Sequence, residues 1–296
     1  MVRYGAWQVG FYNPGMRPDR PDLFGCATMG AVTGRQYHLP ANTGLFMWGD
    51  RLRGCVYAGA YDEVLAGVRK CAFRPSLMIA LFAAAEGADD FLQALQSAMP
   101  GVTVTGGVAA AAEGLDRGEI SPAGGDVALF MSETGSFTAS RRNVLEARGG
   151  IYEFDVEPPR LLKRLRQPDM PWEMAGAVLA DLKERYRVPP DDFSSITFSD
   201  NDGVNLYLHP EGEWLRAASN LPDKGYLHLR TTPAAVAGGA IVEYAQMPNA
   251  LIIGCAAFRG MISRPFSVPE GSTMVFLDSE VADGRLGNLM LVSVRR

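Results

Sequence analysis

Three short apolar runs, far apart in the sequence, each end in glycine and other small residues. They occupy residues 23–30, 102–109 and 251–260. A run of this kind predicts a buried strand, and glycine at its end lets the backbone turn sharply or approach another group closely. The sequence therefore predicts three glycine corners, which would frame a pocket with a backbone floor if they converge.

The composition is that of an ordinary soluble globular protein. Hydrophobic residues make up 47% of the chain and charged residues 21%, with a net charge of -5. Nucleic-acid binding needs clustered Lys and Arg, and the one dense basic stretch, residues 160–166, is interpreted as the solvated face of a helix. Because no apolar stretch has the length of a signal peptide or a membrane span, we expect a cytoplasmic protein without membrane insertion.

The cysteines and histidines argue against a metal site. Cys26, Cys55, Cys71 and Cys255 are scattered without a Cys-x-x-Cys pair, and the chain has three histidines. This spacing does not match a structural zinc site. We expect no metal site, and cysteines that are mostly buried as small hydrophobic side chains.

The periodicity predicts an α/β fold. A strand over 76–82, a helix over 88–99 and a strand over 102–104 form a parallel crossover unit, and a helix over 233–246 leads into a strand at 250–253. A proline-flanked helix over 174–186 is the best candidate for a linker. We predict two similar halves with mixed β-sheets flanked by helices and a shared central cleft: residues 1–160, a helical linker at 161–190, and residues 191–296.

Several segments resemble FIST domains, a bacterial sensory family named for F-box and intracellular signal transduction. Residues 74–82, the following helix and residues 104–109 look like the N-terminal part of the family. Residues 24–32 are similar to its Gly-Cys-(Ser/Thr)-x-x-Gly-Glu-Ile segment, and residues 152–158 to its Glu-Leu-Asp-Gly-x-Pro segment. The C-terminal part is matched by residues 221–226 and 250–259, where a strand ends in Cys and an Arg follows.

The resemblance spans roughly residues 20–262, with departures. Ala31 stands where the family usually has Glu, Val156 stands where it has Gly, and the second Gly-Glu of the C-terminal stretch is not recognisable. The chain resembles a short, divergent member, with residues 1–160 as the FIST N-like half and 191–296 as the FIST C-like half. The resemblance implies a cytosolic sensory module for small ligands, acting here through a separate partner protein.

The ligand expected from the residues is small and either anionic or amino-acid-like. Backbone N–H groups at the corners can bind a carboxylate, which Arg259 or Arg35 can also pair with, and Asp155 or Glu153 can meet an amine. A purely structural role for the same residues stays an alternative. The candidate ligand-binding residues are Cys26, Thr28, Gly106, Gly107, Asp155, Cys255 and Arg259.

Two other functions stay open. Cys255, with Arg259 four residues on, is a candidate catalytic nucleophile if His209 or His228 approaches as a base, which would make the chain a FIST-derived enzyme. One branch of the family binds haem and responds to nitric oxide, and an axial ligand here would have to be His38, His209 or His228. The sequence leaves the cofactor unknown.

Overall fold

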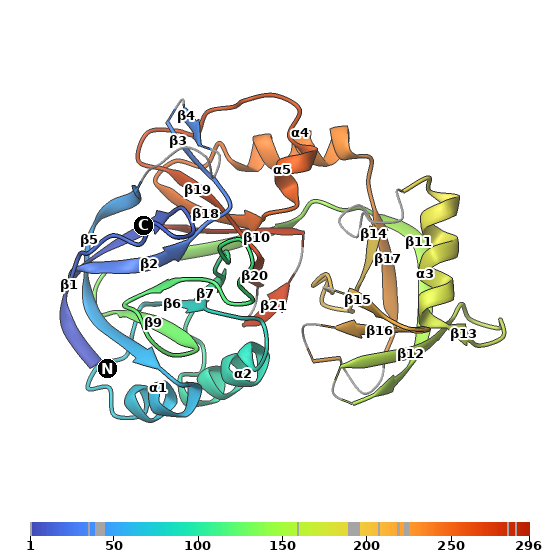
Figure 1. The fold of residues 1–296 in the computed structure, drawn as a ribbon, viewed down its shortest axis with the longest axis horizontal. Helices are drawn as coiled ribbons and strands as arrows, with labels where there is room; N and C mark the ends of the chain where they lie inside the picture. The colour runs from blue at the N-terminus through green and yellow to red at the C-terminus, as the bar shows by residue number, and fades with distance from the viewer. Residues whose placement is uncertain are drawn as a thin grey trace.

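The fold is known from a computed structural model that describes residues 2–34, 36–38, 45–158, 160–188, 196–206, 208–217, 220–221, 225–282, 284–287 and 289–296. Within these residues the protein is a mixed α/β structure of three sheets and five helices, which confirms the predicted class. Figure 1 shows two bodies: a larger one that holds both ends of the chain, and a smaller one beside it. None of the described helices is long and apolar enough to cross a membrane.

The first sheet carries two helices on one face. β6 (Leu77–Phe82) and β7 (Val104–Val108) run parallel and α2 (Ala88–Ala98) connects them, so the predicted crossover unit is confirmed. Together with α1 (Tyr61–Val68), α2 packs on this face through a buried apolar cluster. The strand order is β21 (Arg285–Gly287), β20 (Ser279–Ala282), β7, β6, β9 (Val127–Ser132), β5 (Leu45–Gly59), β1 (Val2–Tyr12), β2 (Leu23–Ala27), β8 (Ile120–Ser121).

The second sheet packs face to face with the first. Phe130 of β9 and Leu277 of β19 belong to one buried cluster, so the two inner faces share a core. α4 (Ala234–Tyr244) and α5 (Phe258–Met261) cover the outer face. The larger body is thus a helix–sheet–sheet–helix sandwich. The strand order is β10 (Thr138–Asn143), β22 (Met290–Arg295), β18 (Ala250–Cys255), β19 (Thr273–Leu277), β3 (Ala31–Thr33), β4 (Gln36–His38).

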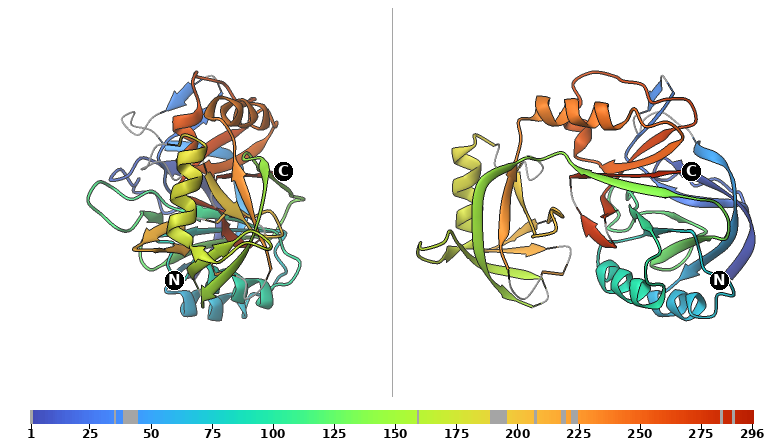
Figure 2. Two further views of the ribbon diagram at one scale, coloured as in Figure 1. Left: turned by 90° about the vertical axis from the view of Figure 1, so that its right-hand side faces the viewer. Right: turned by 180° about the vertical axis from the view of Figure 1, so that it is seen from behind.

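The smaller body, which we call the inserted lobe, consists of the described residues between 147 and 231. α3 (Ala175–Arg185) packs its Val178, Leu179 and Leu182 on the lobe's own sheet. Figure 2 shows the lobe standing beside the sandwich, which the chain leaves after β10 and rejoins before α4. The strand order is β14 (Ile196–Ser199), β17 (Leu227–Thr231), β11 (Ala147–Glu157), β12 (Leu161–Arg166), β16 (Trp214–Ala217), β15 (Leu208–Glu211), with β13 (Glu173–Met174) beside β12.

The basic stretch 160–166 is a strand, and the prediction of a helix there is wrong. Its charges meet carboxylates on the neighbouring strand β11: Arg166 pairs with Glu153 at 2.5 Å, and Arg164 pairs with Asp155 at 2.6 Å. Cross-strand pairing of opposite charges supports a sheet. The charges that suggested a solvated helix face are therefore matched across two strands.

The expected domain boundaries, after residues 160 and 190, both fall within the inserted lobe. β11 pairs with β12 on one side and with β17 on the other, so segments from both sides of each boundary share one sheet. Residues 161–190, expected as a helical linker, contain β12 and β13 before α3. The similarity of two halves and a shared cleft stay predictions.

Candidate functional site

The three glycine corners meet one short segment, residues 276–280, where β19 passes into β20. At the first corner, Met29 donates its backbone N–H to the Phe276 carbonyl at 2.9 Å. At the second, the Asp278 N–H reaches the Val108 carbonyl at 3.0 Å, and at the third, the Ala256 N–H reaches the Leu277 carbonyl at 2.7 Å. The corners do converge, and protein backbone occupies the place where they meet.

Cys26 and Thr28 are buried at the first corner. Thr28 Oγ1 lies 2.7 Å from the Gly30 carbonyl oxygen and 2.8 Å from that of Phe276, so this hydroxyl joins β2 to β19. Burial raises the pKa of the Cys26 thiol, which keeps it protonated. These contacts give both side chains a place in the core.

Gly106 and Gly107 lie in β7, where neighbouring backbone leaves no room for a side chain. A Cβ at Gly106 would collide with the Ala80 carbonyl, and the Gly106 φ of +133° is itself unfavourable for other residues. A Cβ at Gly107 would collide with the Ser279 carbonyl. The second corner therefore needs glycine for strand packing.

Cys255 ends β18 beneath the 276–280 segment and is only 4% exposed. Its Sγ lies 3.7 Å from the Asp278 carbonyl oxygen. Burial, followed by the nearby Glu280 carboxylate, raises the pKa of this thiol, and hydrogen bonds from the Ala257 and Leu289 backbone oppose that rise. The thiol is neutral at pH 7, and a neutral thiol is a poor nucleophile.

The remaining predicted residues lie in different places. Arg259 is in α5, one turn after Cys255, and its buried Nε has no hydrogen-bond partner among the described residues. Asp155 lies in the inserted lobe, where it accepts hydrogen bonds from Arg164 at 2.9 and 2.6 Å. Asp155 thus belongs to a different sheet from the corner residues, and Arg35 lies outside the described residues.

One histidine of the inserted lobe interacts electrostatically with the sandwich. Burial raises the pKa of Asp278, and the charge of His209, on β15, opposes that rise. Desolvation lowers the pKa of His209, and the charge of Asp278 opposes that decrease. Both side chains still reach solvent. His228 hydrogen-bonds Asn201 at 3.2 Å, and the side chain of His38 lies outside the described part. In that part no group of His, Cys, Asp and Glu residues is arranged to hold a metal.

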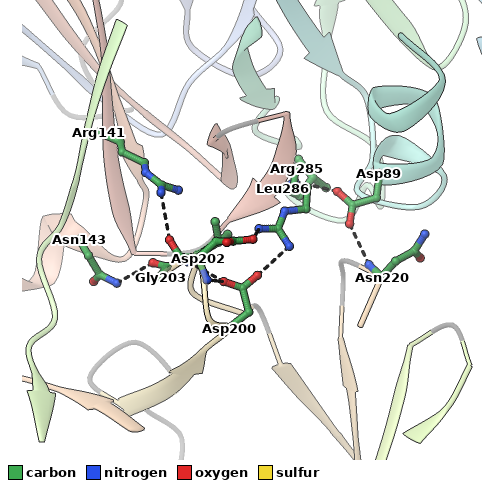
Figure 3. Close-up of polar contacts among 10 residues, drawn as sticks. Asp89, Arg141, Asn143, Asp200, Asp202, Gly203, Asn220, Arg285 and Leu286 are labelled. Atoms are coloured by element: carbon green, nitrogen blue, oxygen red, sulfur yellow. Dashed lines mark hydrogen bonds and ion pairs between the residues drawn. The ribbon is translucent and has the colours of Figure 1, made fainter. Parts of the chain in front are cut away.

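Polar contacts join the lobe to the sandwich at what we call the interlobe junction (Figure 3). Arg285, on β21, pairs with Asp200 at 2.7 Å and with Asp202 at 3.0 Å, both from the lobe. Asp89, at the start of α2, accepts backbone N–H groups from Leu286 of the sandwich at 2.7 Å and from Asn220 of the lobe at 2.8 Å. The lobe is therefore held by directional contacts on the side that faces β21 and α2.

A cavity of about 400 Å³ lies where the chain passes from the lobe to α4, and we call it the crossing pocket. Its walls are Arg148 of β11, residues 186–188 after α3, and residues 231–234, which lead into α4. The pocket thus touches the lobe on two sides and the first turn of a sandwich helix on the third. A movement of the lobe relative to α4 would change its shape.

The lining of the crossing pocket is cationic. Arg148 and Arg187 both line it, and among the described residues no Asp or Glu does. Four other cavities in the described part of the chain each have at most one cationic side chain among their described lining residues. Arg148 also pairs with exposed Glu146 at 3.1 Å, whereas the Arg187 side chain forms no hydrogen bond or ion pair with another described residue, and Arg187 adopts a φ of +55° after α3. The pocket presents positive charge suited to an anion.

Sequence reasoning missed this pocket. Arg148 and Arg187 come from segments with no motif, and only the folding of the lobe sheet brings them together. The one available signal was Thr231-Thr232-Pro233, which marks the start of α4. Comparison with known proteins gives no further guidance: no family model matches the chain, and no curated protein matches it significantly.

Proposed function

We propose that this chain is a cytosolic, FIST-like sensory protein that binds a small anionic ligand in the crossing pocket and acts through a separate partner protein. One observation carries the proposal: two arginines, Arg148 and Arg187, line a small cavity between the lobe and α4, with no carboxylate among its described lining residues. The ligand class agrees with the anionic or amino-acid-like ligand expected from the sequence, although its place differs from the glycine corners.

Two guanidinium groups suit a carboxylate or phosphate. Each presents a planar set of N–H donors that can make paired hydrogen bonds to two oxygens. A cavity of about 400 Å³ is within the range that encloses a small metabolite. Tyr186 and Val188 supply an apolar wall for the carbon skeleton of such a ligand.

The position of the pocket suggests how binding could be reported to a partner. A ligand that touches Arg187 of the lobe and residues 232–234 before α4 favours the lobe position in which both contacts form. A ligand shifts such an equilibrium only through its different affinity for the two positions. The interlobe junction supplies the contacts that this shift would strengthen or weaken.

The proposal favours binding over the two alternatives. The neutral, 4% exposed thiol of Cys255 gives the enzyme hypothesis little support. Haem binding has no support from His228, which hydrogen-bonds Asn201, or from His209, which interacts with Asp278.

The test is thermal denaturation of the full chain with citrate, L-glutamate or phosphate at matched ionic strength. At least one of them should raise the melting temperature, by about 2–4 °C for each kcal/mol of binding free energy. Arg187→Gln should abolish the rise. Arg185→Gln is the matched control, because Arg185 lies two residues earlier, is exposed and pairs with Asp181 at 2.8 Å. Equal responses from both variants would reject the pocket as the binding site.

A further inference from the structure

Arg187 occupies a backbone position that favours glycine. Its N–H bonds to the Glu184 carbonyl at 3.0 Å, and the Val188 N–H bonds to the Lys183 carbonyl at 2.8 Å. α3 therefore ends in a Schellman motif, in which Arg187 takes the left-handed conformation with a φ of +55°. Arginine adopts this conformation at a steric cost that glycine avoids. Strained residues of this kind cluster at functional sites, and the Arg187 side chain lines the crossing pocket.

Arg148 brings a second guanidinium to the pocket, beside the start of α4. Its Nε lies 3.4 Å from the Thr231 carbonyl oxygen, and its Nη2 pairs with the exposed Glu146 carboxylate at 3.1 Å. In the described part of the chain Nη1 has no hydrogen-bond partner, and the same holds for the whole guanidinium of Arg187. Both arginines therefore have N–H groups available to a ligand.

The first turn of α4 is a third set of donors. Pro233 is the N-cap of this helix and makes no side-chain capping bond, and Ala234 is the first helical residue. Both line the pocket and both are exposed. The first N–H groups of a helix have no acceptor within the helix, and they form the positive end of its dipole. Donors from β11, from the end of α3 and from α4 thus meet at one cavity.

Three sets of donors suit a phosphoryl group better than a carboxylate. A carboxylate is planar, and one guanidinium can satisfy both of its oxygens. The phosphoryl group of a monoester has three terminal oxygens in different directions and a charge of about −1.5 to −2 at pH 7, which balances two arginines. An amino acid would also bring an ammonium group, and the described lining residues include no carboxylate to pair with it.

We propose that the ligand of the crossing pocket is a phosphate monoester of a small organic molecule. Its phosphoryl oxygens are bound by Arg148, by Arg187 and by the first turn of α4, and its carbon skeleton lies against Tyr186 and Val188. This inference rests on the proposed function and narrows its anionic ligand to one chemical class. Both arginines belong to the lobe and α4 belongs to the sandwich, so one phosphoryl group joins the two bodies.

The experiment is isothermal titration calorimetry of the full chain with glycerol phosphate, succinate and L-glutamate at matched ionic strength. Glycerol phosphate should bind more tightly than the two carboxylates by about tenfold or more. Its affinity should fall several-fold between pH 7.5 and pH 5.5, because the phosphate group takes up a proton with a pKa of about 6. An affinity that does not change with pH would contradict recognition of the dianion.

The outcomes separate this inference from the proposed function. Arg187-dependent binding of succinate or L-glutamate as tight as that of glycerol phosphate would overturn the phosphate assignment and leave the proposed function standing. Binding of none of the three, or binding that does not depend on Arg187, would reject both.

Variants test each set of donors. Arg187→Gly should raise the melting temperature of the ligand-free chain, because glycine suits the left-handed position, and should abolish the binding of glycerol phosphate. Ala234→Pro removes one N–H at a helix position that tolerates proline, and should weaken binding several-fold. Glu146→Gln releases Arg148 from its ion pair and should tighten binding. Unchanged affinity in Arg187→Gly would overturn the proposal, and unchanged affinity in Ala234→Pro would contradict the choice of phosphate over carboxylate.

Discussion

The guanidinium of Arg285 lies 2.7 Å from the carboxylate of Asp200, an ion pair that joins the sandwich to the inserted lobe (Figure 3). Asp200 is only 4% exposed, and its other contacts are the backbone N–H groups of Asp202 and Val204 within its own turn. Arg285 is therefore the side chain that connects a buried carboxylate of the lobe to the sandwich.

Replacing Arg285 by Met should weaken the attachment of the lobe. Asp200 would keep its turn but lose its cationic partner, at a cost of about 1–3 kcal/mol in the free energy of unfolding. The control is Arg142→Met, which breaks an exposed pair with Glu243 and should cost less than about 1 kcal/mol. Urea denaturation measures both, and equal costs would show that the junction contributes no more than a surface ion pair.

Glu280 makes the stability of the protein depend on pH. Burial raises the pKa of this carboxyl from 4.5 to about 8, so the folded chain binds a proton that the unfolded chain releases between these values. Stability should therefore fall as pH rises from 4.5 to 8, by at most ~1.4 kcal/mol per pH unit, and then level off. Glu280→Gln should remove this part of the fall.

The test measures the free energy of unfolding of the unchanged protein and of Glu280→Gln by urea denaturation at several pH values. The difference between the two proteins at each pH isolates the contribution of Glu280. Asp89 and Asp278 also have raised pKa values. Both residues are present in both proteins, so their contributions to the pH dependence of stability cancel in the difference. A difference that does not change between pH 5 and pH 8 would show that Glu280 is ionised throughout.

Two glycine-to-alanine substitutions should change the free energy of unfolding in opposite directions. Gly107→Ala places a Cβ against the Ser279 carbonyl and should destabilise the fold by about 3 kcal/mol. Gly239→Ala lies in α4 with open space around it and should stabilise by about 0.5–1 kcal/mol. Thermal denaturation gives both values. A tolerated Gly107→Ala would mean that β7 and β20 do not approach as closely as described.

Cys255 should react slowly with iodoacetamide in the folded protein. The sulfur is buried and its raised pKa leaves almost no thiolate at neutral pH, whereas Cys71 is partly exposed. Timed alkylation followed by peptide mass spectrometry should show Cys71 labelled first and Cys255 labelled only after unfolding. Rapid labelling of native Cys255 would revive the enzyme hypothesis.

Local patterns predicted the elements of the fold better than their arrangement. The apolar runs at 77–82 and 250–255 and the helix between β6 and β7 follow from periodicity, because buried strands and amphipathic helices have clear patterns. The strand at 161–166 was missed because its charges are matched by partners on β11, which a single segment does not reveal. That β11 pairs with both β12 and β17 depends on contacts between distant segments.

The candidate site was less predictable for the same reason. Gly106 and Thr28 mark real points of convergence, yet their neighbours are backbone atoms of residues 80 and 276, not a ligand cavity. Arg148 and Arg187 have no sequence signal of their own. They line one pocket because β11 and the end of α3 both lie at the edge of the lobe that faces α4.

The central claim, that a small anion binds in the crossing pocket, is tested most directly by hydrogen–deuterium exchange with and without the anion that stabilises the chain. Slower exchange is predicted in peptides that cover residues 145–150, 184–188 and 230–236, with no change at 104–110 or 253–259. Protection at the glycine corners without protection at the crossing pocket would contradict the account.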